Sequence, residues 1–580
     1  MVQGARWYVG DYMDANTPRS LSPERTSSNS RSGALRFRRP SGGGPRSYAN
    51  TDSANSPQLP EVHNGTNRTQ QTVIAVAVGV LGLGTYLWQL TVPIFLQLYD
   101  SGVYVASAIH LVSGILPYRE FSFVQPPGIL LLLSPIAVIS RIFGSHDGFI
   151  LARVLTALVT ATNASLLAWL VRHRGRVAMV FAGGGLALTP VAVFFSSGVR
   201  LEPYCFFFVL LGSLKISNHF DRSSLSVRPL VVGGLLFGVA AVVEFWAFFP
   251  FLAMMICLLP HYRRRVVAFI FAAGCGLVLP SLPFFIGAPR NFISDVFTGQ
   301  LHHPRSGGGL LRRVVDLTGF SGTSIAPNGT EALVGIGLFA LLVVIAFRRK
   351  ATREFGDFFL LLAACIAVVG LLAAPAAYTD YGYFAAPFLF GLLGVSVGRL
   401  LPSARVPIER VNLSSFSRRF LIVLSSATVA IVTFAVVAFV TTFYSVYLPL
   451  TGVSATAISD IASTIPAGSC VIYDTVGMGL LANRFQSHDA RCPTIVDPFG
   501  FSMAWGYQTS TPAREYVARW RTYLTAAKYL VVAVPLVETP KAVRELPYQG
   551  MIPWDLGLES WFKRHYHLVS CEPDCIYVHE

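Results

Sequence analysis

The chain has 580 residues, of which 53% are hydrophobic and 13% charged, and its formal net charge is +15. Long apolar runs recur from residue 72 to residue 444, which excludes a soluble globular protein and indicates an integral membrane protein. The basic residues gather in short clusters between these runs, as the positive-inside rule expects, so the net charge is no sign of nucleic-acid binding.

The first 70 residues are rich in Ser, Arg, Gly, Pro and Asn and show no apolar period. Such a composition cannot bury a core, so residues 1–70 are expected to be a disordered cytoplasmic tail. The first membrane-spanning helix is predicted at about 72–95. Asp100 follows it at the edge of the bilayer, where an ionisable group is costly and often functional. A cap of the next helix is the alternative role for this carboxylate.

A juxtamembrane region is expected after Asp100. Residues 103–116 place apolar side chains on one face and polar ones on the other, which predicts a helix lying on the membrane surface. The apolar run 128–143 is short and is interrupted by Pro135 and Arg141. If it spanned the membrane, the basic cluster at 172–176 would face outward. We therefore interpret 128–143 as a juxtamembrane or re-entrant helix.

The remaining spans are predicted at about 148–171, 177–196, 204–216, 230–243, 245–259, 266–286, 331–347, 358–374, 384–398 and 420–444. The pair around Glu244 could be one kinked helix or two short ones, and the parity of the topology favours two. The result is a polytopic α-helical membrane domain at 71–445 with eleven spans. Every later basic cluster then falls on the cytoplasmic side, with the C-terminus outside.

Residues 446–580 are predicted to form an extracytoplasmic α/β domain. A helix near 453–465, strands at 469–473 and 529–534, a helix at 512–527 and a closing segment at 568–579 are expected. Cys470, Cys492, Cys571 and Cys575 all lie here, and an even set in an oxidising compartment indicates disulfides. Cys470–Cys492 and Cys571–Cys575 are plausible pairs, although spacing does not determine connectivity. A zinc site is the alternative.

Candidate site residues lie on the predicted outer side. Glu202 begins a helix beside Pro203 and could face Asp100 across a shared cavity, with Arg200 as a ligand for phosphate or carboxylate. The same residues are also a good helix N-terminal signature. The role of Glu244, which lies deeper, stays open between function and a helix end.

Two further outer segments carry candidate ligands. The glycine-containing loop 288–330 is expected to bind a phosphate group through basic side chains, or to be merely solvated; its candidates are His302, His303, Arg305, Arg312 and Arg313. A turn at 376–382 contains Tyr378, Asp380 and Tyr381, where aromatic rings could bind a sugar or anchor the chain at the bilayer interface.

Several short motifs in the stretch 90–202 carry a family resemblance. They are Asp100 after the first span, Gly114-Ile-Leu-Pro-Tyr118, Gln125-Pro-Pro-Gly128, Phe143-Gly144 and Arg153. In these the chain resembles the GT-C membrane glycosyltransferases that use polyprenyl-phosphate sugars, in the branch with protein O-mannosyltransferases and lipid A aminoarabinose transferase. An eleven-span body with an outer C-terminal α/β domain is also similar to actinobacterial arabinosyl- and mannosyltransferases of the cell wall.

The resemblance implies inverting transfer of a sugar from a polyprenyl-phosphate donor to a glycan, lipid or protein hydroxyl at the outer face of the plasma membrane. It implies that Asp100 is the catalytic base. Many members have Asp-Glu where this chain has Asp100-Ser101, so the second acid is expected elsewhere, with Glu202 the candidate. Tyr104, Tyr118 and Arg119 lie in the matching stretch and are expected to bind substrate. A divalent cation, Mg²⁺ or Mn²⁺, is a candidate cofactor.

Two other functional classes stay open at this level. A transporter or flippase of lipid-linked glycans would need ionisable residues along a path through the membrane, whereas here they concentrate at the outer surface. A cell-wall scaffold would leave Asp100 dispensable. The chain has no Walker loop, GxSxG or HExxH motif and no dinucleotide fingerprint, which argues against a nucleotide-driven machine or a standard hydrolase.

Overall fold

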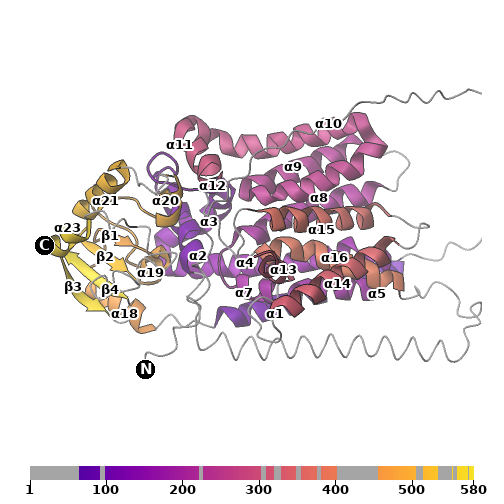
Figure 1. The fold of residues 1–580 in the computed structure, drawn as a ribbon, viewed down its shortest axis with the longest axis horizontal. Helices are drawn as coiled ribbons and strands as arrows, with labels where there is room; N and C mark the ends of the chain where they lie inside the picture. The colour runs from indigo at the N-terminus through magenta and orange to yellow at the C-terminus, as the bar shows by residue number, and fades with distance from the viewer. Residues whose placement is uncertain are drawn as a thin grey trace, which may run out of the picture. The chain divides into compact units, whose positions relative to one another are not determined.

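A computed structural model of the chain describes residues 65–91, 98–220, 226–301, 309–318, 328–347, 354–374, 381–400, 455–504, 514–532, 552, 558–571 and 574–580. Within it, Asn67–Glu580 packs as one compact unit. The architecture is a helical membrane body followed by a small C-terminal α/β segment (Figure 1). The predicted fold class is therefore confirmed.

The membrane body contains a helix or helical run at each predicted span that falls in the described residues. These are α1 (Gly65–Leu90), α4 (Ser145–Leu170), the run from α5 (Arg176–Met179) to α7 (Pro190–Phe195), α8 (Leu201–Phe220), α9 (Val227–Val243), α10 (Phe248–Gly287), α14 (Asn328–Phe347), α15 (Phe355–Ala373) and α16 (Tyr381–Leu400). Among the residues that the structure describes, five helical segments are long and apolar enough to cross a membrane, and five further apolar helices are shorter. The span predicted at 420–444 lies outside the described residues.

Helix α10 contains two of the predicted spans, 245–259 and 266–286. Its 40 residues would extend about 60 Å if straight, twice the thickness of the hydrocarbon core. On such a helix Phe251 and Phe269 would be about 27 Å apart. Their rings instead stack with centroids 5.3 Å apart. The helix therefore folds back on itself between these residues, and its two arms are the two predicted spans.

The span predicted at 177–196 is not one regular helix. It consists of α5, the π-helical segment η2 (Val180–Gly184), α6 (Gly185–Leu188) and α7. Thr189 is extended, with ψ 138°, because Pro190 disfavours helical geometry in the residue before it. Glycines at 183, 184 and 185 lie at the end of η2, and their backbone adopts the π-helical turn easily because glycine has no Cβ.

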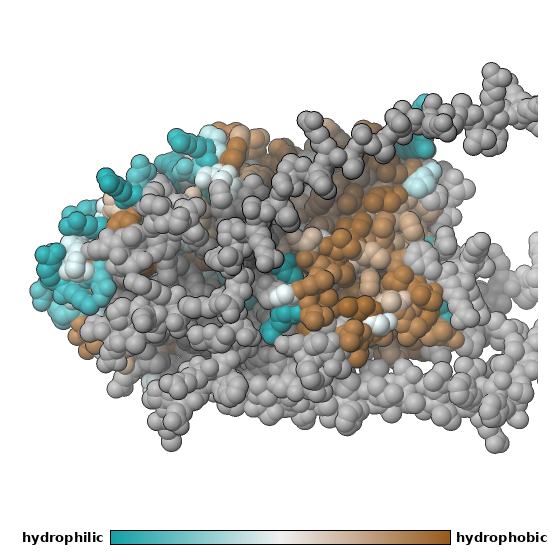
Figure 2. Space-filling view, viewed as in Figure 1, coloured by the Kyte–Doolittle hydropathy of each residue, from teal (hydrophilic) through white to brown (hydrophobic). Residues whose placement is uncertain are grey.

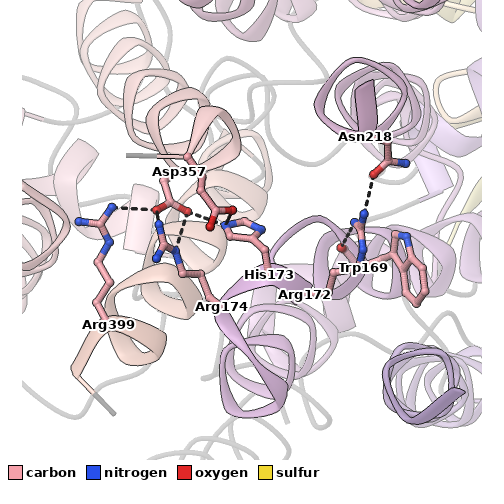
Figure 3. A network of polar contacts seen from close by, with 8 residues as sticks. Trp169, Arg172, His173, Arg174, Asn218, Asp357 and Arg399 are labelled. Carbon is pink, nitrogen blue, oxygen red and sulfur yellow. Dashed lines mark hydrogen bonds and ion pairs between the residues drawn. The ribbon is translucent and has the colours of Figure 1, made fainter. Parts of the chain in front are cut away.

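One end of the bundle gathers the basic side chains. Arg399 at the end of α16 donates to Asp357 in the first turn of α15, with 2.8 Å between Nη2 and Oδ2. Arg174, just after α4, donates to the same carboxylate, with 3.2 Å between its Nε and Oδ1. Beside them Arg172 donates to Asn218 of α8 at 2.6 Å (Figure 3). We call this the basic end; it brings together loops that the charge rule predicted on one side.

The opposite end, called the acidic end here, carries Asp100, Glu202 and Glu244 together with short juxtamembrane helices. These helices are α2 (Leu98–Val112), α3 (Gly128–Phe143), α11 (Pro289–Ile293), η4 (Ser294–Thr298), α12 (Gly299–Leu301) and α13 (Leu310–Thr318). Helix α3 matches the predicted bounds. The loop predicted at 288–330 is instead largely helical in its described parts, 288–301, 309–318 and 328–330, because Pro289 favours a helix start and 310–318 is amphipathic.

Helix α2 is not the surface helix that was predicted. It starts five residues earlier, so that Asp100 lies in its first turn. Both faces are covered: Val105 and Ile109 are buried on one side, and Ser107 is completely buried on the other. The cause is that α2 packs between α3 and α19 (Val476–Leu481) of the C-terminal segment (Figure 1).

The C-terminal segment contains a four-stranded sheet with the order β1-β2-β4-β3. Strands β1 (Val471–Tyr473) and β2 (Tyr529–Val532) are parallel, with Ile472 opposite Leu530. Strands β3 (Tyr566–Cys571) and β4 (Cys575–His579) form the predicted closing segment as an antiparallel hairpin. The flanking helices are α18 (Ala455–Thr464), α19, α20 (Pro498–Ala504), α21 (Arg514–Ala526) and α23 (Leu558–His565). Both plausible disulfides, Cys470–Cys492 and Cys571–Cys575, are present.

The bundle and the C-terminal segment share a hydrophobic core. The main cluster of buried side chains runs from the bundle into α18 and β1, where it includes Ile461 and Tyr473. A second cluster around Tyr516 and Trp520 belongs to the C-terminal segment alone. Outward-facing apolar side chains cover the bundle, such as Phe271 on α10 at 73% exposure, and hydrophilic ones cover the C-terminal segment (Figure 2). That division fits a body surrounded by lipid.

Candidate active site

Asp100 is the third residue of α2 and lies at the acidic end of the bundle. Its side chain is 41% exposed, and its Oδ2 accepts a hydrogen bond from Nη1 of Arg200, whose own side chain is 10% exposed. A carboxylate near a helix N-terminus is also favoured by the positive end of the helix dipole. The arrangement leaves one accessible carboxylate held by a buried cation.

The serine after Asp100 connects α2 to the turn that carries Arg200. The hydroxyl of Ser101 accepts the N–H of Val199 at 2.8 Å and lies 3.4 Å from the carbonyl of the same residue. Ser101 is completely buried. Ser101 thus fixes the backbone beside Arg200, and so brings the guanidinium to Asp100.

The predicted second acid, Glu202, is brought to the same place together with Glu244. Both are buried, at 7% and 8% exposure. Both act electrostatically on Tyr104, which lies one helical turn after Asp100. Burial is the main cause that raises the pKa of the Tyr104 hydroxyl, the charges of Asp100, Glu244 and Glu202 add to it, and Arg200 opposes it. Three carboxylates and one guanidinium are therefore near enough to this phenol to affect its pKa.

Glu244 is positioned by a close helix contact. It is extended, with φ −154° and ψ 126°, between the end of α9 and the short 3₁₀ helix η3 (Phe245–Ala247). Next to it, a Cβ on Gly128 would lie 2.5 Å from the carbonyl oxygen of Val242. Only glycine allows α3 to start so close to α9. The Gln125-Pro-Pro-Gly128 motif therefore helps to place Glu244 at the site.

The C-terminal segment forms a wall beside α2. A Cβ on Gly102 would lie 2.4 Å from the backbone nitrogen of Gly477, so α2 and α19 meet backbone to backbone. The side chain of Asn483 accepts the N–H of His146 at 2.9 Å, and the hydroxyl of Ser145 donates to the carbonyl of Leu480 at 2.9 Å. These bonds fasten the start of α4 to the end of α19.

Two buried carboxylates lie behind this wall. Asp497, which precedes α20, accepts the hydroxyl of Tyr99 at 2.9 Å and the N–H of Gly500 at 2.8 Å. Asp295 in η4 accepts the N–H of Phe123 at 3.1 Å. Burial, the largest cause in both cases, raises the pKa of Asp497 to about 6 and that of Asp295 to about 7. The charge of Asp100 adds to the rise at Asp497, and the charge of Asp497 to that at Asp295.

The predicted ligands in the first outer segment take different positions. Tyr118 is 2% exposed, and its hydroxyl donates to the carbonyl of Gln125 at 2.6 Å. Its backbone has a φ of 66°, and its ring packs on Phe292 with centroids 4.9 Å apart. These contacts give Tyr118 a role in the fold of this loop. Arg119 is exposed and lies 3.6 Å from Glu120.

The arginines of α13 contact the protein itself. Arg313 donates to the carbonyls of Leu372 and Ala374 and so closes the C-terminal end of α15. Arg312 lies 3.3 Å from Asp316 in an i,i+4 pair. Tyr381 lies in the first turn of α16 and packs on Trp246, with ring centroids 5.3 Å apart. The candidates outside the described residues are His302, His303, Arg305, Tyr378 and Asp380.

Within the ranges that the structure describes, no three His, Cys, Asp or Glu side chains come together in a way that could hold a metal ion. A group of three such ligands for the Mg²⁺ or Mn²⁺ considered from the sequence is therefore absent from that part of the chain. The positive charge beside Asp100 is the guanidinium of Arg200.

Sequence reasoning did not identify Tyr99, Ser101, Asp295 or Asp497. Asp497-Pro498 does have the signature of a helix start, an acceptor followed by proline at the first helical position. Tyr99 and Asp497 are 398 residues apart, and no local pattern connects them.

Comparison with known proteins places this fold. No protein-family model and no curated protein matches the chain. Among solved structures, ArnT from Cupriavidus metallidurans bound to undecaprenyl phosphate is similar, with a TM-score of 0.53 and 14% identity over 89% of this chain and 98% of that one. Its apo form has a TM-score of 0.53 and 15% identity over 88% and 98% of the two chains.

The oligosaccharyltransferase of Archaeoglobus fulgidus, tethered to an acceptor peptide, is also similar. Its TM-score is 0.50 and its identity 12%, over 88% of this chain and 74% of that one. At such identities the likeness is one of fold. The chain shares the fold of these two proteins, as the resemblance of its outer motifs implied.

Proposed function

We propose that this protein is a glycosyltransferase that moves a sugar from a polyprenyl-phosphate donor to a hydroxyl of a glycan, lipid or protein. In this proposal the reaction inverts the anomeric carbon, and Asp100 is the general base. The bundle lies in the plasma membrane with its basic end and N-terminus cytoplasmic, and its acidic end and C-terminal segment outside. A role in assembling cell-envelope glycans follows from that location.

The observation that carries the proposal is the exposure of Asp100 among buried charges. Its side chain is 41% exposed. The side chain of Arg200 is 10% exposed, and the residues Glu202 and Glu244 are 7% and 8% exposed. A general base must be reachable by its substrate while its surroundings are rigid. The GT-C fold adds support, since the ArnT structure of that fold holds undecaprenyl phosphate.

The proposed reaction uses these groups in simple roles. The acceptor oxygen attacks the anomeric carbon as the bond from that carbon to the phosphate oxygen breaks. The acceptor proton passes to Asp100, and polyprenyl phosphate leaves with the electron pair. A guanidinium has five N–H donors, so Arg200 can hold Asp100 and a phosphate oxygen together. Glu202, Glu244 and Tyr104 shape the field at the reacting atoms.

The test is sugar transfer by purified protein with polyprenyl-phosphate donors. Asp100→Asn should lower kcat by about 10²- to 10⁴-fold, the usual contribution of a general base. Asp147→Asn is the matched control, because Asp147 is an exposed carboxylate in the first turn of another helix, α4, and should transfer like wild type. Undiminished turnover by Asp100→Asn would refute the role of this residue. Translocation of lipid-linked glycan without transfer from any donor would favour a transporter.

A further inference from the structure

A hydrogen-bonded contact ties the residue before Asp100 to the C-terminal segment. The hydroxyl of Tyr99 donates to Oδ1 of Asp497 at 2.9 Å and accepts the N–H of Phe499 at 2.8 Å. Asp497 itself is 7% exposed. Tyr99 thus bridges a side chain and a backbone group of the turn that starts α20. The contact joins two parts of the chain that lie 398 residues apart.

The partner of Tyr99 is held firmly. Oδ1 of Asp497 also accepts the N–H of Gly500 at 2.8 Å. A Cβ on Gly500 would lie 2.1 Å from Oδ2 of Asp497 and 2.9 Å from Cγ1 of Val124. The carboxylate therefore packs closely against the backbone of Gly500, where a side chain would displace it. Burial raises the pKa of this carboxyl to about 6, so at neutral pH it is mostly an ionised acceptor for the phenol.

The first turn of a helix is the part that most needs such support. Its N–H groups have no partner within the helix, and helix ends fray. Asp100 is in that turn, between Tyr99, which is bonded to the C-terminal segment, and Ser101, which is bonded to Val199 at 2.8 Å. The residues on either side of Asp100 are thus hydrogen-bonded to two different parts of the chain, the C-terminal segment and the turn that contains Val199.

We propose that Tyr99 and Asp497 are positioning residues for Asp100. Through the contact between these two residues, the C-terminal segment takes part in catalysis. The inference rests on the proposed function, in which Asp100 takes the acceptor proton. The pair does not touch the reacting atoms; it keeps the first turn of α2 in place. A displacement of about 1 Å in a reacting group can cost about 100-fold in rate.

The kinetic test is Tyr99→Phe, which removes only the bridging hydroxyl. We expect kcat to fall by about 10- to 100-fold, with the KM for donor changed by less than about twofold. Tyr566→Phe is the matched control: its buried hydroxyl also makes two bonds, to the carbonyls of Leu524 at 2.7 Å and Ala527 at 2.9 Å, within the C-terminal segment. That variant should keep kcat. Because Tyr99 acts through Asp100, Tyr99→Phe should leave the residual rate of Asp100→Asn unchanged.

Hydrogen exchange provides a second measurement that needs no activity. Tyr99→Phe and Asp497→Ala, each of which removes the bond between these side chains, should both speed amide exchange in 98–103, whereas Tyr566→Phe should not. Unchanged exchange in 98–103, or faster exchange with full kcat, would overturn the positioning role. A rise in the KM for donor without a change in kcat would also overturn the positioning role. If wild type transfers no sugar, but Tyr99→Phe still speeds amide exchange in 98–103, then the contact does position the first turn of α2 and only the proposed function fails.

Discussion

Replacement of Asp295 by asparagine should stabilise this protein at neutral pH. Asp295 is 4% exposed and accepts the N–H of Phe123 at 3.1 Å. Burial is the main cause that raises its pKa from 3.8 to about 7, hydrogen bonds from Phe123 and Ser122 oppose the rise, and the charge of Asp497 adds to it. An asparagine has a similar shape, keeps an oxygen for the Phe123 N–H, and cannot ionise.

The direction of the pH dependence follows from proton linkage. The folded protein binds the Asp295 proton more tightly than the unfolded chain does, so this group stabilises the fold fully below about pH 4. The stabilisation is lost as the pH rises through about 7. A rise in pKa from 3.8 to about 7 corresponds to at most about 4 kcal/mol. Asp295→Asn should therefore match wild type near pH 4 and exceed it by about 2–4 kcal/mol at pH 8.

The assay is thermal unfolding of detergent-purified protein at a series of pH values from 4 to 8.5. The difference in Tm between Asp295→Asn and wild type should widen with pH and reach a few degrees at pH 8. Asp147→Asn, at an exposed site, should show no such widening. A difference that does not vary with pH, or a variant less stable than wild type at pH 8, would refute this account of Asp295.

Three further predictions concern stability and helix contact. Asp357→Ala should lower the free energy of unfolding by about 3–5 kcal/mol, measured as a loss of Tm, because two partly buried arginines at the basic end lose their carboxylate. Gly102→Ala should lower kcat at least about tenfold by forcing α2 away from α19, whereas Gly84→Ala, with open space around it, should not change kcat. The double variant Cys470→Ser with Cys492→Ser should lower the free energy of unfolding by about 3 kcal/mol. A reductant should then lower the Tm of this variant less than it lowers the Tm of wild type, because the bridge is already absent.

The arrangement of the helices could be predicted because membrane insertion is governed by local signals. Basic residues between apolar runs indicate orientation, and the same rule removed 128–143 from the spans. The structure agrees: Arg174 and Arg399, from different loops, meet at one carboxylate. Local patterns also identified the strands β1 and β2, which are short apolar runs.

The site was predicted only in part, because a sequence shows which groups exist but not which way they point. The sequence indicated Asp100, Arg200 and Glu202 because each flanks a helix start, and the structure has these residues at one end of the bundle. Tyr118 was expected to bind substrate, yet its ring is buried. The hold of Asp497 on Tyr99 arises from packing between distant segments, which no local pattern encodes.

The charge cluster at the basic end has a consequence for how the protein is made. Arg174 precedes its partner Asp357 by 183 residues, and Arg399 follows Asp357 by 42 (Figure 3). At a synthesis rate of about 5–20 residues per second, Arg174 waits roughly 10–40 seconds for that carboxylate. In the proposed topology, its charge would help to keep the early helices oriented in the membrane during this interval.

When α15 inserts, Asp357 neutralises the waiting arginine and ties the early half of the bundle to the late half. The ion pair is then completed by Arg399, one helix later. In the proposed topology, the guanidinium of Arg174 would therefore first orient the early helices and afterwards join the early and late halves of the finished bundle through Asp357.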